Sequence, residues 1–186
     1  MLLSFCLFGC VESGQPANNA SNSINITGGN AMEEIVKAGD VVKVDYVGSY
    51  ADSGKLFDTS IESEAKKAGL PVRPYYEPLE FTVGSGQMIK GFDKAVVGMK
   101  INEEKTITIQ PEDAYGNRDE NLVLIIDLNE LTTQLGDAPK EGDSLQTNSG
   151  ATGLITKIES NNVTVDFNHA LADKTLVFKI IMKKIN

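Results

Sequence analysis

The chain has 186 residues, which suffice for one or two compact domains, and its 41% hydrophobic content can supply a core. Its 26 acidic and 17 basic residues give a formal net charge of -9, which argues against binding nucleic acid phosphates or an anionic membrane surface. Both cysteines, Cys6 and Cys10, stand at the N-terminal end, so the body of the chain has neither a disulfide framework nor a cysteine metal site.

The N-terminal residues are mostly apolar up to Cys10 and then change abruptly to a polar stretch. The tetrapeptide LFGC at positions 7–10 resembles a lipobox, in which a signal peptide is cut before the cysteine and the cysteine is lipidated. We therefore expect residues 1–10 to be a lipoprotein signal, Cys10 to be the lipidation site and residues 11–38 to be a polar linker. The alternative is a frayed apolar N-terminus.

A strand pair is predicted at the start of the globular part. Residues 41–50 are rich in β-branched and aromatic side chains with alternating faces, and residues 56–60 follow after the turn at 52–55. Two strands joined this tightly should pair in antiparallel fashion. Residues 61–70 are good helix formers, and the three prolines in residues 71–78 predict an extended, exposed loop.

A strand, a glycine turn and a short helix follow one another between Leu79 and Met99. Apolar and polar residues alternate over residues 79–83, which predicts a half-buried strand. From Met88 onward the apolar residues take the spacing of a helix face, with two rows that meet at Phe92. We expect a helix of about eleven residues that ends at Gly98 and packs its apolar face on a sheet.

Two further strands are predicted later in the chain. Residues 103–110 alternate between a polar and a partly apolar face, and the PEDAYG segment at 111–116 ends that strand. Residues 175–185 place large apolar side chains on one face and lysines on the other. This pattern predicts a closing antiparallel strand.

Six short fragments occur in a fixed order along the chain. They are VDYVG at 44–48, GKLFDTS at 54–60, FTVG at 81–84, IKGF at 89–92, PEDAYG at 111–116 and LVF at 176–178. In this order they resemble the FKBP-type peptidyl-prolyl cis-trans isomerases, over residues 39–116 and 171–185. The resemblance implies an α+β fold in which a twisted antiparallel sheet wraps around the short helix.

The resemblance also implies the residues of an active pocket. Its catalytic positions correspond to Tyr46, Phe57, Asp58, Met88, Ile89, Phe92, Tyr115 and Phe178, and its substrate-binding positions to Leu79, Ala170 and Leu171. Two of these depart from the commonest family pattern, because Leu79 stands where many members have an aromatic residue and Phe92 where many have tryptophan. Both residues remain apolar, so we expect the pocket to persist.

About fifty residues separate Gly116 from Leu171, where a small family member would have a short loop. This segment contains an apolar run, a helix-like stretch and a hairpin signal around residues 159–162. It resembles the insert-in-flap domain of the SlyD-like, long-type members that are typical of archaea. At its exit the family usually has glycine where Phe167 and Asp173 stand here.

We therefore expect two folded parts. An isomerase domain would comprise residues 39–118 and 169–186, and a small, mainly β, chaperone-like insert would comprise residues 119–168. In this arrangement the insert interrupts the isomerase domain rather than following it.

The chemistry that such a pocket performs is physical rather than covalent. Rotation about an X-Pro bond costs roughly 18 to 20 kcal/mol because the amide loses resonance as it twists. The twisted amide is less charge-separated than the planar one, so a dry apolar pocket favours it relative to water. The apolar pocket residues would grip the proline ring, and Tyr115 could donate a hydrogen bond to the substrate carbonyl. No cofactor, metal or nucleophile is required.

Each of these residues also has a purely structural interpretation. From pattern alone, Ile89, Phe92 and Phe178 would be core residues. Asp58 could be a turn residue and Tyr115 a strand cap. His169, the single histidine, has no cysteine nearby, so we expect no metal site.

The predicted function is that of a monomeric, extracytoplasmic peptidyl-prolyl isomerase with chaperone activity from its insert domain, anchored to the cell membrane through lipid alone. Its partners would be proline-containing, unfolded or partly folded polypeptides, and not nucleic acid. The alternative is a holding chaperone in which the insert binds unfolded chains and the isomerase pocket is secondary.

Overall fold

A computed structural model describes residues 34–186 of the chain. The lipobox-like segment with Cys10 and residues 11–33 of the expected polar linker lie outside these described residues. The end of that stretch is not a linker, because Val36 is 1% exposed in the core of the first sheet and its amide donates to the carbonyl of Met99 at 2.9 Å. Among the described residues, no helix combines the length and the apolar character needed to cross a membrane.

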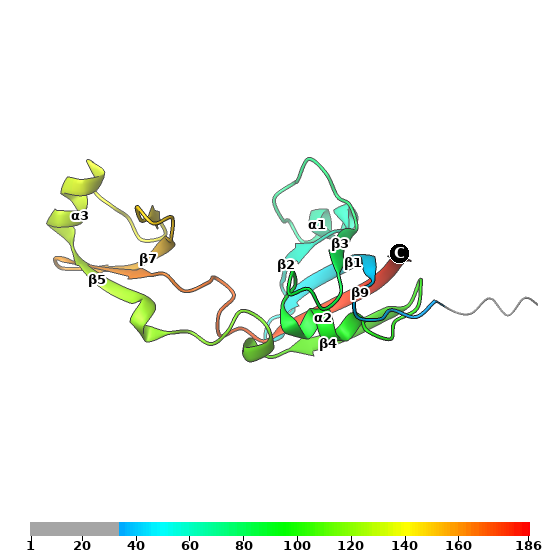
Figure 1. Cartoon of the computed structure of the whole chain (residues 1–186). Coiled ribbons are helices and arrows are strands. Elements are labelled where there is room, and N and C mark those ends of the chain that lie inside the picture. The colour runs from blue at the N-terminus through cyan, green and yellow to red at the C-terminus, as the bar shows by residue number, and fades with distance from the viewer. Residues whose placement is uncertain (1–33) are drawn as a thin grey trace, which may run out of the picture. The chain divides into compact units, whose positions relative to one another are not determined.

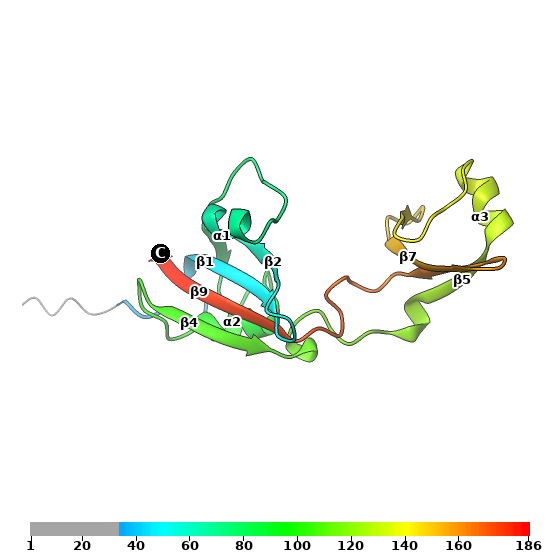
Figure 2. The same cartoon turned by 180° about the vertical axis from the view of Figure 1, so that it is seen from behind.

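A five-stranded antiparallel sheet is built around strand β1 (Val41–Tyr50), as Figures 1 and 2 show from opposite sides. Along one side, β1 pairs from Val42 to Tyr50 with β9 (Leu176–Ile185). Along the other, it pairs first with β3 (Leu79–Thr82) and then with β2 (Leu56–Thr59). β4 (Glu104–Ile109) pairs with the outer edge of β9. These five strands are the ones that the alternating sequence patterns predict.

The core of this sheet comes from the alternation in β1 and β9. Val42 and Val44 on β1 are fully buried, as are Leu176, Ile180 and Met182 on β9. Since alternate residues of a strand point to one face, the buried set covers one side and leaves the lysines of β9 on the other. The mixed fold of antiparallel sheets with few helices agrees with the α+β class predicted from the sequence.

Helix α2 (Lys90–Val96) packs its buried residues Phe92 and Val96 against this core. It has seven residues, whereas the spacing of the apolar residues predicted about eleven. The difference arises because the glycine turn continues to Met88, and because Val97 is already extended before Gly98 takes a positive φ of 84°. Met99, beyond the helix, is nevertheless buried, so apolar spacing alone overestimated the helix.

The chain between β2 and β3 forms a short helix and a long loop. Helix α1 (Glu62–Lys67) has six residues, fewer than the ten that the sequence suggested, and buries only Ala65. Gly69 ends it with a φ of 68°, and the amide of Leu70 donates to the carbonyl of Ala65. In the following loop Val72 is exposed, as the prolines predict.

A second, four-stranded sheet lies in sequence between β4 and β9, two strands that are neighbours in the first sheet. Its order is β5 (Val123–Asp127), β8 (Asn162–Asp166), β7 (Thr152–Glu159) and β6 (Ser144–Gln146). The hairpin of β7 and β8 is the one that the sequence indicates. All four strands fall within residues 119–168, and the domain boundaries themselves stay a prediction.

This second sheet has a hydrophobic cluster of its own. Val163, Val165 and Ile155 are buried on one face, where Leu131 of helix α3 (Leu128–Leu135) packs against them. The carboxylate of Asp127 caps the start of α3 by accepting from the amides of the second and third helical residues. The second sheet therefore packs around a hydrophobic cluster distinct from that of the first sheet.

Paired polar groups connect the two segments that lead into and out of the second sheet. The amide of Asp119 donates to Oδ1 of Asn168 at 2.8 Å, and Nδ2 of Asn168 donates to the carbonyl of Asp119 at 2.9 Å. Arg118 pairs with Asp166 at 3.0 Å and also contacts Glu120, which begins the 3-10 turn η2 (Glu120–Leu122).

The two non-glycine residues at the exit are accommodated differently. The ring of Phe167 lies over Gly153, where a Cβ atom would be 2.7 Å from its Cε1 atom. Asp173 adopts a φ of 62°, in the left-handed region that favours glycine. Its amide is held by the carbonyl of Gly116 at 2.9 Å, which ties the returning chain to the end of the PEDAYG segment.

Candidate functional site

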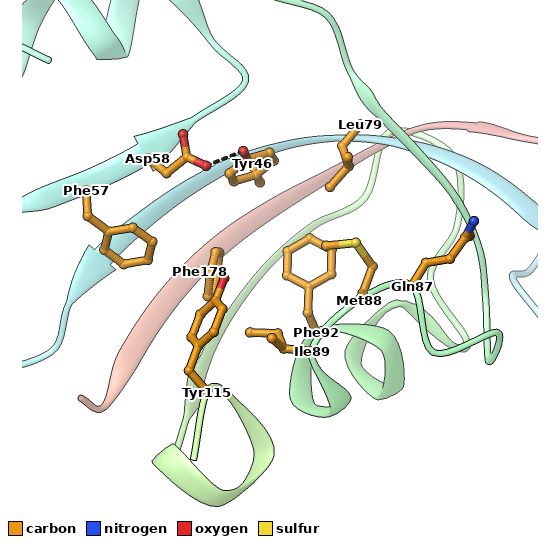
Figure 3. Close-up of a pocket in the computed structure, with 10 residues that line it drawn as sticks. All are labelled: Tyr46, Phe57, Asp58, Leu79, Gln87, Met88, Ile89, Phe92, Tyr115 and Phe178. Atoms are coloured by element: carbon orange, nitrogen blue, oxygen red, sulfur yellow. Dashed lines mark hydrogen bonds between the residues drawn. The ribbon is translucent and has the colours of Figure 1, made fainter. Parts of the chain in front are cut away.

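A cavity of about 210 Å³ opens on the first sheet beside α2 (Figure 3). Its lining comes from β1, β2, β3, β9, the start of α2 and the segment after β4. The residues are Tyr46, Phe57, Asp58, Leu79, Gln87, Met88, Ile89, Phe92, Tyr115 and Phe178. Residues that are far apart in sequence therefore converge on one small cavity.

Aromatic rings in edge-to-face contact make the floor of the cavity. Phe92, 1% exposed, lies 5.3 Å from Phe178 between ring centroids at an interplanar angle of 86°. Phe57 meets Phe178 in the same manner at 5.7 Å and 86°. Edge-to-face pairs are the arrangement that aromatic quadrupoles favour, so these rings hold one another in fixed orientations.

Gly48 provides the room that this arrangement needs. On β1 it stands opposite Phe178 on β9 and opposite Asp58 on β2. A Cβ atom at Gly48 would lie 2.8 Å from Cζ of Phe57 and 3.0 Å from Cε1 of Phe178. The two phenylalanine rings thus occupy the space that any larger residue at this position would need.

Asp58 is fully engaged at the rim of the cavity. Its Oδ2 accepts a 2.6 Å hydrogen bond from the hydroxyl of Tyr46, drawn in Figure 3. Its Oδ1 accepts from the amide of Thr59 at 2.8 Å and also contacts the guanidinium of Arg73. With these three partners the carboxylate is compensated and holds the Tyr46 ring in the wall.

Burial and the neighbouring carboxylate raise the pKa values of the two tyrosines in the cavity. Burial, and after it the hydrogen bond to Asp58, raise the pKa of Tyr46 to about 12. Burial, and after it the charge of Asp58, also raise the pKa of Tyr115. Both phenols are therefore neutral hydrogen-bond donors at physiological pH.

Tyr115 follows the 3-10 turn η1 (Pro111–Asp113), and its hydroxyl points into the cavity (Figure 3). Among the described residues the hydroxyl has no hydrogen-bond partner, so it is available to a bound molecule. The Tyr115 ring is stacked on the imidazole of His169, with centroids 4.1 Å apart and an interplanar angle of 2°.

The structure gathers most of the predicted residues. All eight expected catalytic residues and Leu79 line the cavity. Ala170 and Leu171 do not: Leu171 packs on the core of the first sheet, and Ala170 is exposed. Both residues lie in the turn that follows His169.

Three residues of the site were missed by the sequence reasoning. Gln87 lines the cavity and accepts from the amide of Thr82 at 2.8 Å, and its position next to Met88 was a signal that could have found it. Arg73 pairs with Asp58 from a loop that was predicted to be exposed. His169 stacks on Tyr115 although the whole second sheet lies between them in the sequence. No local sequence pattern predicts either contact.

The shifted phenol of Tyr46 leads to a testable pH dependence. Because folding favours its neutral form, this contribution to stability is present below the ordinary pKa of 10.0 and is lost as the pH rises towards about 12. In an absorbance titration of the 5 tyrosines, we expect Tyr46→Phe to remove an ionisation near pH 12. Ionisation of all tyrosines together near their ordinary pKa in the folded protein would contradict the geometry.

Comparison with known proteins agrees with the fold. The model of the family described as FKBP-type peptidyl-prolyl cis-trans isomerase matches residues 32–183, a range that contains the second sheet and all of the first except the last two residues of β9. A short-type peptidyl-prolyl cis-trans isomerase of Methanocaldococcus jannaschii is 46% identical over 156 residues, which cover 83% of this chain and 96% of that protein. Its name gives no support to the long-type assignment made from the sequence.

Relatives in fungi match a shorter stretch. FK506-binding protein 1A of Neurospora crassa is 46% identical over 82 residues, which cover 44% of this chain and 58% of that protein. FK506-binding protein 2 of Candida glabrata is 40% identical over 80 residues, which cover 43% and 50%. On the strength of the family model and the methanogen relative, the chain belongs to the FKBP-type peptidyl-prolyl cis-trans isomerases and is an enzyme of that class.

Proposed function

We propose that the aromatic cavity binds proline and is where the chain speeds X-Pro isomerisation in unfolded or partly folded polypeptides. The observation that carries this proposal is the convergence of ten residues from six segments on one cavity of about 210 Å³. This volume lies below the roughly 300 to 1,000 Å³ of sites for drug-sized ligands, and it suits a single side chain such as a proline ring.

The apolar floor would favour the twisted amide. A planar X-Pro amide is more charge-separated than a twisted one, so removing it from water costs more free energy. The faces and edges of Phe57, Phe92 and Phe178 supply a water-poor surface for the ring. Since every 1.36 kcal/mol of differential stabilisation is about tenfold in rate, a few such contacts account for substantial catalysis.

The hydroxyl of Tyr115 would donate a hydrogen bond to a substrate carbonyl. Its raised pKa keeps the phenol protonated, and it has no competing partner among the described residues. Asp58 would act differently, because its oxygens are occupied by Tyr46, Thr59 and Arg73. We assign it the role of holding the cavity wall, not that of an acid or base.

Replacing Phe57 tests the cavity assignment. Phe57→Ala removes part of the cavity floor, and because Phe57 is only half-buried and packs against the buried core without belonging to it, we expect a folded protein with kcat/KM on a proline tetrapeptide reduced about tenfold or more. Uncatalysed exchange takes tens to hundreds of seconds, which makes the loss easy to measure. Tyr75→Ala, at an 80% exposed residue outside the cavity, is the control. Full activity in folded Phe57→Ala would reject the assignment.

A second proposal concerns the second sheet, which we infer to be a SlyD-like insert that binds unfolded segments. Ile125 is 71% exposed and Leu154 is 47% exposed. Ile125 pairs with Thr164 and Leu154 with Asp166, so both lie on the face opposite the buried Val163 and Val165. Exposed apolar residues on an open sheet suit the capture of extended apolar chains.

The covalent link between the two sheets would keep a captured chain close to the cavity. The second sheet is joined to the first by the segments next to Tyr115 and Leu171, so a chain bound there stays at a high effective concentration, commonly millimolar for short links. Catalysis on proteins should then gain more than catalysis on short peptides, which need no capture surface. A holding chaperone with a secondary isomerase pocket would show the capture without this gain.

The double variant Ile125→Ser, Leu154→Ser tests the capture surface in the full chain. We expect tetrapeptide activity to remain and activity on a proline-limited refolding protein to fall severalfold, because only the protein substrate uses the surface. Val72→Ser is a matched control, because Val72 is 72% exposed and lies outside the second sheet. Replacing residues 121–167 by a short glycine-rich loop should have the same selective effect. Equal loss on both substrates would mean that the second sheet only supports the cavity.

We also propose that the protein acts outside the cytoplasm, held at the membrane by lipid on Cys10. The motivation is the lipobox-like segment, which lies outside the described residues. Expressed with its own start, the protein should fractionate with membranes, and Cys10→Ser should release it. Because one acyl chain anchors only marginally, mass spectrometry should find at least two. An unmodified N-terminus at Met1 would refute the proposal.

A further inference from the structure

We propose that His169 is a positioning residue for the isomerase site: its imidazole stacks on Tyr115 and holds the phenol hydroxyl over the cavity. This inference rests on the proposed role of the cavity. Its physical basis, the ring stack, can be measured whether or not the protein is active.

The need for such a support follows from the surroundings of Tyr115. The side chain is 38% exposed, and within residues 34–186 its hydroxyl has no hydrogen-bond partner. The aromatic contacts of the cavity floor do not include it, and its one ring partner in the described part of the chain is His169, at 4.1 Å and 2°. Without a hydrogen bond or a second ring contact, this partly exposed side chain would otherwise move among rotamers.

The imidazole is itself held in place. Its Nδ1 accepts a 3.1 Å hydrogen bond from the amide of Leu171, which leaves Nε2 as the protonated nitrogen of the neutral ring. Leu171 in turn packs on the core of the first sheet. Two residues further on, the amide of Asp173 donates to the carbonyl of Gly116, the residue after Tyr115. The support is therefore anchored on both the core and the segment that it positions.

The stack with His169 should affect the rate of catalysis only through the position of the Tyr115 hydroxyl. If the Tyr115 hydroxyl contributes a hydrogen bond in the transition state, the rate depends on how often the ring is correctly placed. Loss of the stack should lower kcat/KM by about 2- to 10-fold, the size of one aromatic pair at about tenfold per 1.36 kcal/mol. The effect should vanish when the hydroxyl is absent.

Three substitutions separate the ring from the hydrogen bond. His169→Phe keeps a stacking ring but loses the Nδ1 acceptor. His169→Asn keeps an acceptor for the Leu171 amide but loses the ring, and His169→Ala loses both. We expect His169→Phe to retain most of kcat/KM on a proline tetrapeptide, and the other two to lose about 2- to 10-fold, all with far-UV dichroism like that of the parent.

A double-mutant cycle then assigns the effect to Tyr115. Tyr115→Phe retains the stacked ring without the hydroxyl, so adding His169→Ala to it should cost less than His169→Ala costs alone. Equal and additive losses, or a His169→Phe variant as impaired as His169→Ala, would show that His169 only shapes its turn and would overturn the inference.

Proton NMR tests the stack independently of activity. His169 is the single histidine, so its two ring C–H resonances need no further assignment. At one fixed pH they should be displaced upfield by the Tyr115 ring, and Tyr115→Leu should return them to ordinary positions, whereas Tyr75→Leu should not. Undisplaced resonances in the parent protein would overturn the inference. A displaced signal in a protein without isomerase activity would instead count against the proposed function of the cavity.

Discussion

The contact between Phe92 and Phe178 is the interaction on which the site depends. Phe92 comes from the short helix and Phe178 from the closing strand, and their edge-to-face packing joins helix α2 to the sheet at the floor of the cavity. A helix of seven residues is too short to be stable alone in water. It exists because the sheet covers its apolar face, and the sheet in turn obtains a floor for the cavity from it.

The same packing makes the site both core and binding surface. Phe92 and Phe178 belong to the buried cluster of the first sheet and also line the cavity. The structural and the functional interpretations of these residues are therefore both correct. Around this rigid floor the polar groups are few and satisfied, since Asp58 is held by a phenol, an amide and a guanidinium. A compensated carboxylate lets an otherwise apolar cavity keep a fixed wall.

The second sheet is inserted where the first sheet tolerates it. β4 and β9 are adjacent and remain paired from Glu104 to Ile109, although the chain between them makes four further strands. The reciprocal hydrogen bonds between Asp119 and Asn168 join the two connecting segments. Nearer the first sheet, the hydrogen bond from the amide of Asp173 to the carbonyl of Gly116 joins the same two segments. These hydrogen bonds hold the two ends of the inserted segment together, so that β4 and β9 stay paired next to the site.

The sequence by itself determined the strands of the first sheet, the β7–β8 hairpin and the membership of nine residues in one cavity. Alternation is a local signal that each strand carries alone, whereas the nine cavity residues were identified only through the resemblance of the ordered motifs to a known family. The sequence overestimated both short helices, because helix-forming residues around α1 and apolar spacing around α2 continue through residues whose backbone has already left the helix. Only the tertiary structure decided that Arg73 pairs with Asp58, that His169 stacks on Tyr115, and that Leu171 packs on the core instead of lining the cavity. Those contacts join loops distant in the chain, and their geometry exists only once the paired strands have brought the loops together.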